Sequence, residues 1–117
     1  MIDARLILPP SHHAKARSGL RAEFTQQVQG ALAGAWLPPH AELELLLHCH
    51  GRWRGKQGQI LRRDLKNLLY VAEDTIFDFL RIDDSHNFRI VIDKREDADH
   101  YVRAIARELT ILPPEGV

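Results

Sequence analysis

The stretch from Arg62 to Ser85 places the strongest constraint on the fold, because it reads as one amphipathic helix bounded by charged residues. Its apolar residues recur every three or four positions, which places them on one stripe of a helix. Asp64 suits the N-cap, since its carboxylate can accept an orphan backbone N–H at the positive helix end. We expect the helix to end near Leu80 and to be followed by Asp83 and Asp84 just before a strand. The expected stripe is Leu65, Leu68, Leu69, Ala72, Ile76 and Phe79.

Hydrophobic periodicity predicts the other elements. Strict alternation predicts strands over 2–8, 41–50 and 88–92. A spacing of four predicts a helix over 19–34. Apolar residues also repeat at helical spacing after Asp97, so we favour a helix over strand for 98–108, with a short strand over 109–112 as a possible continuation.

This order of elements predicts an α+β fold, a small mixed or antiparallel sheet with helices packed on one face. A chain of 117 residues fits a single domain, 1–117, with a tail at 112–117. Cys49 is the only cysteine, which rules out an internal disulfide and favours a reducing, cytoplasmic setting. No apolar run is long enough to span a membrane, so we expect no membrane partner.

Charge is balanced overall, with sixteen basic and sixteen acidic residues, but it is segregated along the chain. A glycine-rich basic loop over 51–59 contains Trp53 and leads into Asp64, which favours phosphate contact with base stacking over a solvated hairpin tip. A second basic loop over 11–18 fits a phosphate contact or a solvated loop equally well. The predicted DNA-binding residues are Arg52, Trp53, Arg54, Lys56, Arg62, Arg63, Lys15 and Arg17.

Two histidines, His48 and His50, have the spacing of two metal ligands on a strand. No third ligand lies nearby in the sequence, so the favoured interpretation is two histidines on the wetter face of a sheet.

The order of Asp64, a helix of about four turns, Asp83-Asp84 and a strand resembles the RusA family of Holliday junction resolvases. The matching stretches are Arg62-Arg63-Asp64-Leu65-Lys66-Asn67-Leu68-Leu69-Tyr70, Ile82-Asp83-Asp84-Ser85 and an N-terminal Leu8-Pro9-Pro10-Ser11. The resemblance spans roughly residues 2–95.

The resemblance implies a RusA-like crossover junction endodeoxyribonuclease, a Mg²⁺-dependent hydrolase of DNA recombination and repair. It implies branched, four-way DNA as the partner and a homodimer as the working assembly. Carried over residue by residue, it gives Asp64 and Asp84 as metal ligands, with Asp83 and Asn67 beside them as catalytic residues.

Two positions depart from the family pattern. Lys66 replaces the second acidic ligand, and Tyr70 replaces a catalytic lysine. The Lys66 ammonium could lie between Asp64 and Asp84 and take the place of the cation. Three hypotheses follow: a Mg²⁺-dependent resolvase, a catalytically silent relative that binds branched DNA, and a protein–protein adaptor that reuses the fold.

Overall fold

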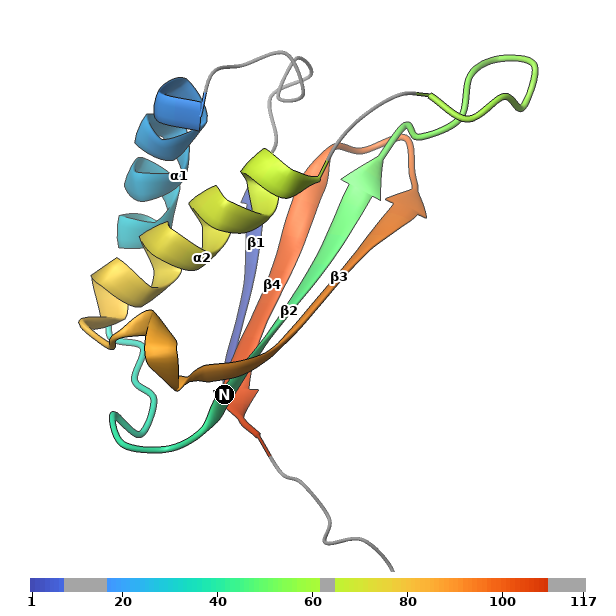
Figure 1. Ribbon diagram of the computed structural model, residues 1–117. Coiled ribbons are helices and arrows are strands. Elements are labelled where there is room, and N and C mark those ends of the chain that lie inside the picture. Colours follow the sequence, from blue (N-terminus) through green and yellow to red (C-terminus); the bar gives the residue numbers. More distant parts are fainter. Residues whose placement is uncertain (8–16, 62–64, 110–117) are drawn as a thin grey trace, which may run out of the picture.

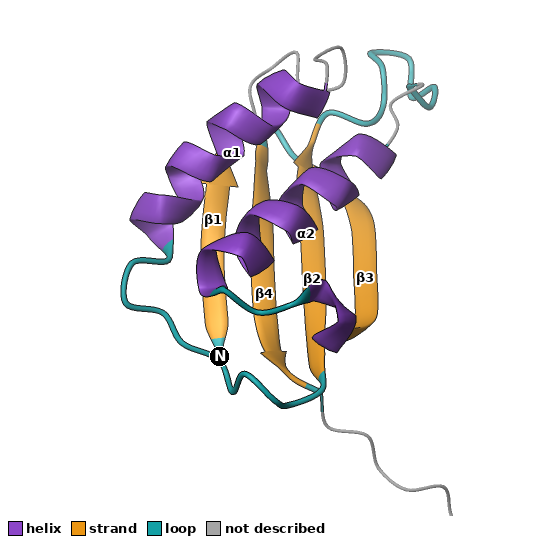
Figure 2. Cartoon of the chain, turned by 60° about the vertical axis from the view of Figure 1, so that its left-hand side comes forward, coloured by secondary structure: helices purple, strands orange, loops and turns teal. Residues whose placement is uncertain are grey.

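Two layers, a four-stranded mixed sheet and a pair of helices on one of its faces, make up the fold (Figures 1 and 2). The computed structural model describes residues 1–7, 17–61 and 65–109. The elements are β1 (Ile2–Ile7), α1 (Arg17–Ala31), β2 (Leu43–Gly51), α2 (Lys66–Leu80), a 3-10 helix η2 (Asp84–His86), β3 (Asn87–Glu96) and β4 (Tyr101–Glu108). This confirms the predicted α+β class. None of the helices described is long and apolar enough to cross a membrane.

The strand order is β1-β4-β2-β3, so the last strand in sequence lies inside the sheet. β4 runs antiparallel to both β1 and β2, whereas β2 and β3 are parallel. Two parallel strands that are neighbours in a sheet need a long crossover connection. Helix α2, which follows β2 and precedes β3 in the sequence, provides it and crosses one face of the sheet (Figure 1). β3 is therefore left at an edge of the sheet.

The core lies between the sheet and the two helices. β2 contributes four side chains with 0% exposure, Leu43, Leu45, Leu47 and Cys49. The expected spacing of four in α1 is confirmed, because Leu20, Phe24, Val28 and Leu32 are all 1% exposed or less. Helix α1 thus buries one face against the sheet and against α2.

The prediction of a helix over 98–108 is wrong, because these residues form β4. Val102, Ala104 and Ala106 are buried on the helix-covered face, and β4 is hydrogen-bonded to a strand on each side. In a short segment, the same apolar residues can fit both the spacing of a helix and the alternation of a strand. Here hydrogen bonding to a neighbouring strand on each side favours the strand. The carboxylate of Asp97 accepts the backbone N–H of Asp99 (3.1 Å) in the turn before β4.

Helix α2 matches its predicted end but not its full predicted stripe. Leu65 occupies the N-cap position without a side-chain hydrogen bond, and the expected cap, Asp64, lies outside the described residues. The helix ends at Leu80, where Arg81 adopts a left-handed conformation with φ 56°. Of the stripe, Leu68, Ala72 and Ile76 are buried, whereas Leu65, Leu69 and Phe79 are half-buried; Val71, Thr75 and Phe77 are buried as well.

Truncating Leu68 to alanine should lower the free energy of unfolding by ~2–5 kcal/mol, because its side chain is fully buried between α2 and the sheet. Ile60, which is 80% exposed, provides the control: Ile60→Ala should change it by less than ~0.5 kcal/mol. Chemical denaturation measures both. Equal effects of the two substitutions would contradict the packing described for α2.

Candidate functional site

Glu73, Asp74 and Asp84 form an acidic group in which one carboxylate oxygen from each residue lies within 4.8 Å of the others. Glu73 and Asp74 belong to α2, and Asp84 begins η2. The left-handed turn at Arg81 reverses the chain after α2 and brings Asp84 back toward the second half of that helix. Asp84 is exposed and the other two are half-buried. Hard carboxylate oxygens gathered in this way are the ligands that Mg²⁺ prefers.

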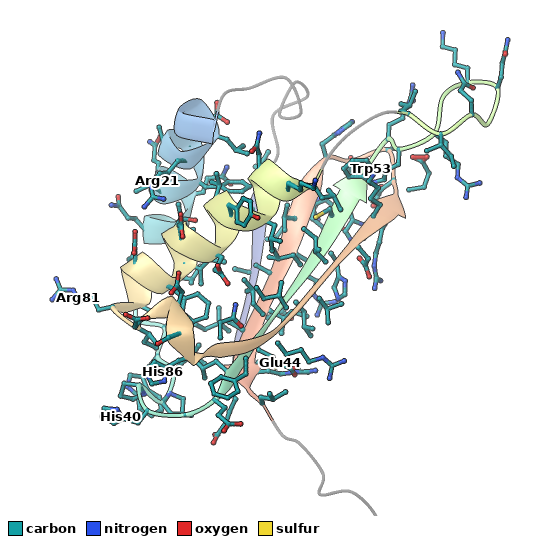
Figure 3. All side chains as sticks on the ribbon, in the orientation of Figure 1. Arg21, His40, Glu44, Trp53, Arg81 and His86 are labelled. Carbon is teal, nitrogen blue, oxygen red and sulfur yellow. The ribbon has the colours of Figure 1, made fainter. Side chains whose placement is uncertain are left out.

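Two neighbouring side chains hold this acidic group in place. Asn87 donates its amide N–H to Glu73 (Nδ2 to Oε2, 2.7 Å). Arg21 of α1 donates to Asp74 (Nη1 to Oδ2, 3.0 Å) and to Asp78 (Nη2 to Oδ2, 2.7 Å), and Figure 3 labels this arginine beside α2. The guanidinium of Arg21 therefore already compensates part of the negative charge of Asp74.

Of the predicted catalytic and metal-binding residues in the described part of the chain, only Asp84 belongs to the acidic group. Asp84 joins the acidic group, but Asp64 lies outside the described residues. Asp83 caps η2: its carboxylate accepts the backbone N–H of Ser85 (2.8 Å), and this hydrogen bond lowers its pKa. Asn67 is exposed in the first turn of α2.

Glu73 and Asp74 were not among the predicted site residues, because they follow Asp64 by nine and ten residues, ~13 Å or more along a helix at ~1.5 Å per residue. The chain reversal that brings them to Asp84 depends on a left-handed residue at Arg81, and an arginine there gives no sequence signal comparable to glycine. The sequence feature that could have indicated Glu73 and Asp74 is their place on the helix that directly precedes Asp83-Asp84.

The two divergent positions, Lys66 and Tyr70, are exposed on the first half of α2. Lys66 lies seven residues before Glu73, about 10 Å along the helix axis at ~1.5 Å per residue. Because Asp64 is outside the described residues, the expected approach of Lys66 to Asp64 or Asp84 stays a prediction.

Arg52, Arg54 and Lys56 line one hollow of about 630 Å³, which we call the basic hollow. The hollow is also lined by Glu96, the last residue of β3, and by Asp97 and Ala98 in the turn that follows. The loop that carries the cations extends beyond the end of the sheet (Figure 1). Glu96 accepts the backbone N–H groups of Trp53 (3.0 Å) and Arg54 (2.7 Å), so its carboxylate fixes the base of this loop. Of the other predicted DNA contacts, Arg62, Arg63, Lys15 and the side chain of Arg17 lie outside the described residues.

Trp53 does not present its ring for base stacking, contrary to the expectation. It is 5% exposed, and its indole N–H donates to the carbonyls of Cys49 (2.9 Å) and Arg95 (3.1 Å). A tryptophan with a satisfied N–H and a buried ring is a structural anchor. Figure 3 labels it at the end of β2, and its hydrogen bonds to carbonyls of β2 and β3 fix the start of the basic loop to the sheet.

His48 and His50 lie on the helix-free face of the sheet, each paired with a carboxylate. His48 Nδ1 is 3.1 Å from Asp93 Oδ1, and His50 Nδ1 is 3.1 Å from Asp97 Oδ2. Among the described residues, no group of three potential metal ligands includes either histidine. The favoured interpretation, two histidines on a polar sheet face, agrees with these pairs.

The carboxylates of both pairs have lowered pKa values. For Asp93, burial acts to raise the pKa, but hydrogen bonds from Arg95 and His48 outweigh it. For Asp97, the backbone N–H of Asp99 is the main cause of the lowering, and His50 adds to it.

No protein-family model matches the chain, and no curated protein matches it. The resemblance to the RusA family therefore rests on the motifs quoted above.

The lowered pKa of Asp93 predicts a loss of stability in acid. The unfolded chain binds a proton near the ordinary value of 3.8 before the folded chain does. The stabilisation is therefore present above that pH and is lost as the pH falls through the folded pKa. Unfolding measured from neutral pH down to pH ~2 should show a smaller acid-dependent loss for Asp93→Asn than for the wild type. Identical pH profiles would mean that the carboxylate is not held by His48 and Arg95.

Proposed function

We propose that this domain is a RusA-like protein that binds branched DNA through the basic hollow and holds a divalent cation at the acidic group. The observation that carries the proposal is the convergence of Arg52, Arg54 and Lys56 on one hollow. These three are among the cations that the sequence predicts to contact DNA, and their place along one hollow supports that role.

The basic hollow suits a nucleic-acid backbone. Guanidinium groups can bind a phosphate through two parallel hydrogen bonds, and an ammonium adds a point charge. Glu96, which lies in the wall of the hollow, is already occupied by two backbone N–H groups. A zero net charge removes long-range attraction by the whole domain, so binding would depend on this local gathering of charge.

The acidic group fits Mg²⁺ in its donor chemistry. Mg²⁺ takes oxygen ligands at ~2.1 Å, so neighbouring ligands of an octahedron are ~3 Å apart and opposite ligands are ~4 Å apart. The three carboxylate oxygens lie within 4.8 Å of one another and would move closer together to bind the ion. A cation bound there would supply charge stabilisation at a phosphate and a polarised water. The chain itself contributes the three carboxylates, and Asn87 orients that of Glu73.

A second candidate function, DNA binding without cleavage, is favoured by the contact between Arg21 and Asp74. That guanidinium competes with a metal ion for the same carboxylate. Tyr70 in place of a lysine also removes a charge that could stabilise the transition state. Mg²⁺-dependent cutting of a four-way junction separates the resolvase from the silent relative.

Replacing Arg52, Arg54 and Lys56 together by glutamine should weaken binding to a four-way junction regardless of its sequence. It should also reduce the salt slope by up to ~2.7, at ~0.9 for each phosphate that the chain no longer neutralises. Fluorescence anisotropy at several salt concentrations measures both. Arg81→Gln, an exposed cation at the far end of α2, serves as the control and should leave both unchanged. A triple variant with wild-type affinity and salt slope would mean that this loop is not the DNA contact.

Asp84→Asn should weaken Mg²⁺ or Mn²⁺ binding measured by calorimetry, because it removes one charged ligand of the acidic group. Asp83→Asn is the matched control, since that neighbouring carboxylate caps η2 and should not affect the metal. Arg21→Gln should strengthen cation binding by releasing Asp74. If the wild type binds neither ion, the cation part of the proposal is wrong.

A further inference from the structure

The helix-free face of the sheet is an open surface made by all four strands. Both α1 and α2 lie on the opposite face (Figures 1 and 2), and no other element of the described chain crosses this one. The strand registers arrange its side chains in rows across the sheet. Because side chains on one strand alternate between the two faces, neighbouring rows are two residues, ~7 Å, apart.

A row in the middle of this face is apolar. Ile105 of β4 pairs with Leu46 of β2, and Leu46 pairs with Val91 of β3. Ile105 is 8% exposed, and the other two are half-buried. Neighbouring strands are ~4.8 Å apart, so the three side chains form a strip ~10 Å long, which we call the apolar strip. An apolar centre within polar surroundings is the arrangement found at protein–protein interfaces.

Arginines flank the apolar strip on both sides. Arg5 and Arg103 pair directly in the row on one side, whereas Arg89 and Arg107 both lie opposite Glu44 in the row on the other side. The two rows are four residues apart along β4, which is ~13 Å at ~3.3 Å per residue. A partner that covers the strip therefore meets arginines along both of its sides.

The guanidinium groups are the outer charges of these two rows. Glu44 contacts the Nε atoms of Arg107 (2.5 Å) and Arg89 (3.9 Å), yet its side chain is 6% exposed, against 45% and 62% for the two arginines. Asp3, which is less exposed than Arg103, accepts two hydrogen bonds from it (3.0 and 2.6 Å). These carboxylates hold the arginines from below, and each guanidinium carries further N–H donors. The surface is thus complementary to carboxylates.

The composition of this face disfavours a nucleic acid as its partner. Single strands bind by stacking their bases on exposed aromatic rings. The ring of Tyr101 is stacked on His50 of β2 (4.3 Å between centroids) and lies under Arg5 of β1 (3.6 Å from the guanidinium carbon to the centroid). Both sides of this ring are therefore covered, and the apolar strip beside it is aliphatic. Asp93, in the same row as Arg103, would also repel a phosphate chain.

We propose that the helix-free face is a docking surface for an acidic, amphipathic α-helix of a partner protein. A helix with its side chains is ~10–12 Å across, which matches the space between the two arginine rows. Lying along the apolar strip, it places its apolar stripe on Leu46 and the neighbours of Leu46 in the row. Aspartates and glutamates beside that stripe then reach Arg103 on one side and Arg89 and Arg107 on the other. An extended strand, ~4.8 Å wide, would not reach both rows.

A designed helical peptide tests this proposal. The probe is about five turns long, with leucines at spacings of three and four and glutamates on both sides of that stripe. A side-chain cross-link on its outer face holds it helical and so reduces the entropy lost on binding. In the control peptide, lysine replaces every glutamate. Fluorescence anisotropy should show saturable binding of the acidic peptide and binding at least ~10-fold weaker for the lysine peptide.

Substitutions in the chain identify the surface that binds the probe. Arg89→Gln combined with Arg103→Gln removes one arginine from each row and leaves Arg107 beside Glu44. The Kd for the acidic peptide should rise ~10-fold in this double variant. Val91→Asp introduces a carboxylate into the apolar strip and should abolish binding. Arg81→Gln, at the end of α2, is the matched control and should keep the wild-type Kd. Thermal unfolding shows whether each variant is folded.

A wild type that binds neither peptide, or both equally well, would overturn the proposal, as would wild-type affinity in the folded double variant. Displacement of the peptide by an oligonucleotide that itself binds the double variant more weakly would also overturn it, because the face would then bind nucleic acid. The inference goes beyond the proposed function and shares no residue with the basic hollow or the acidic group. The triple glutamine variant of the hollow should bind the acidic peptide with unchanged Kd, so the two proposals can fail separately.

Discussion

Everything in this domain depends on β2, whose inner face is completely buried and whose two edges are both paired. Its four inward side chains have no exposed area, and burial of each of the three leucines contributes about 1.5–3 kcal/mol, an upper range because unfolded chains already bury some apolar surface. Antiparallel pairing with β4 and parallel pairing with β3 give the sheet its mixed character. The parallel pair requires α2 as a crossover, and the crossover in turn fixes where the acidic group can form.

The two functional surfaces are consequences of this crossover. The loop that leaves β2 carries the basic hollow, and the turn that enters β3 carries Asp84. Because β2 and β3 run in the same direction, these connections lie at opposite ends of the sheet (Figure 1). A single chain therefore keeps the basic hollow and the acidic group apart, at opposite ends of the sheet.

Hydrophobic periodicity predicted the elements whose structure follows from their own local sequence. The spacing of Leu20, Phe24 and Val28 and the alternation along β2 indicated one helix and one strand close to their observed bounds. Features set by distant partners were not predictable. β4 became a strand because two neighbours pair with it, and Trp53 became an anchor because carbonyls of β2 and β3 accept its N–H. The acidic group was missed because it depends on the backbone of one residue, Arg81.

The most direct test of DNA binding through the basic hollow is a titration of the ¹⁵N-labelled chain with a four-way junction, followed by amide chemical shifts. We expect the largest changes in the loop from Arg52 to Lys56 and in the facing turn at Glu96–Ala98. Changes confined to the helix-free face of the sheet, around His48 and Arg103, would contradict DNA binding through the hollow, as would the absence of any change at low salt.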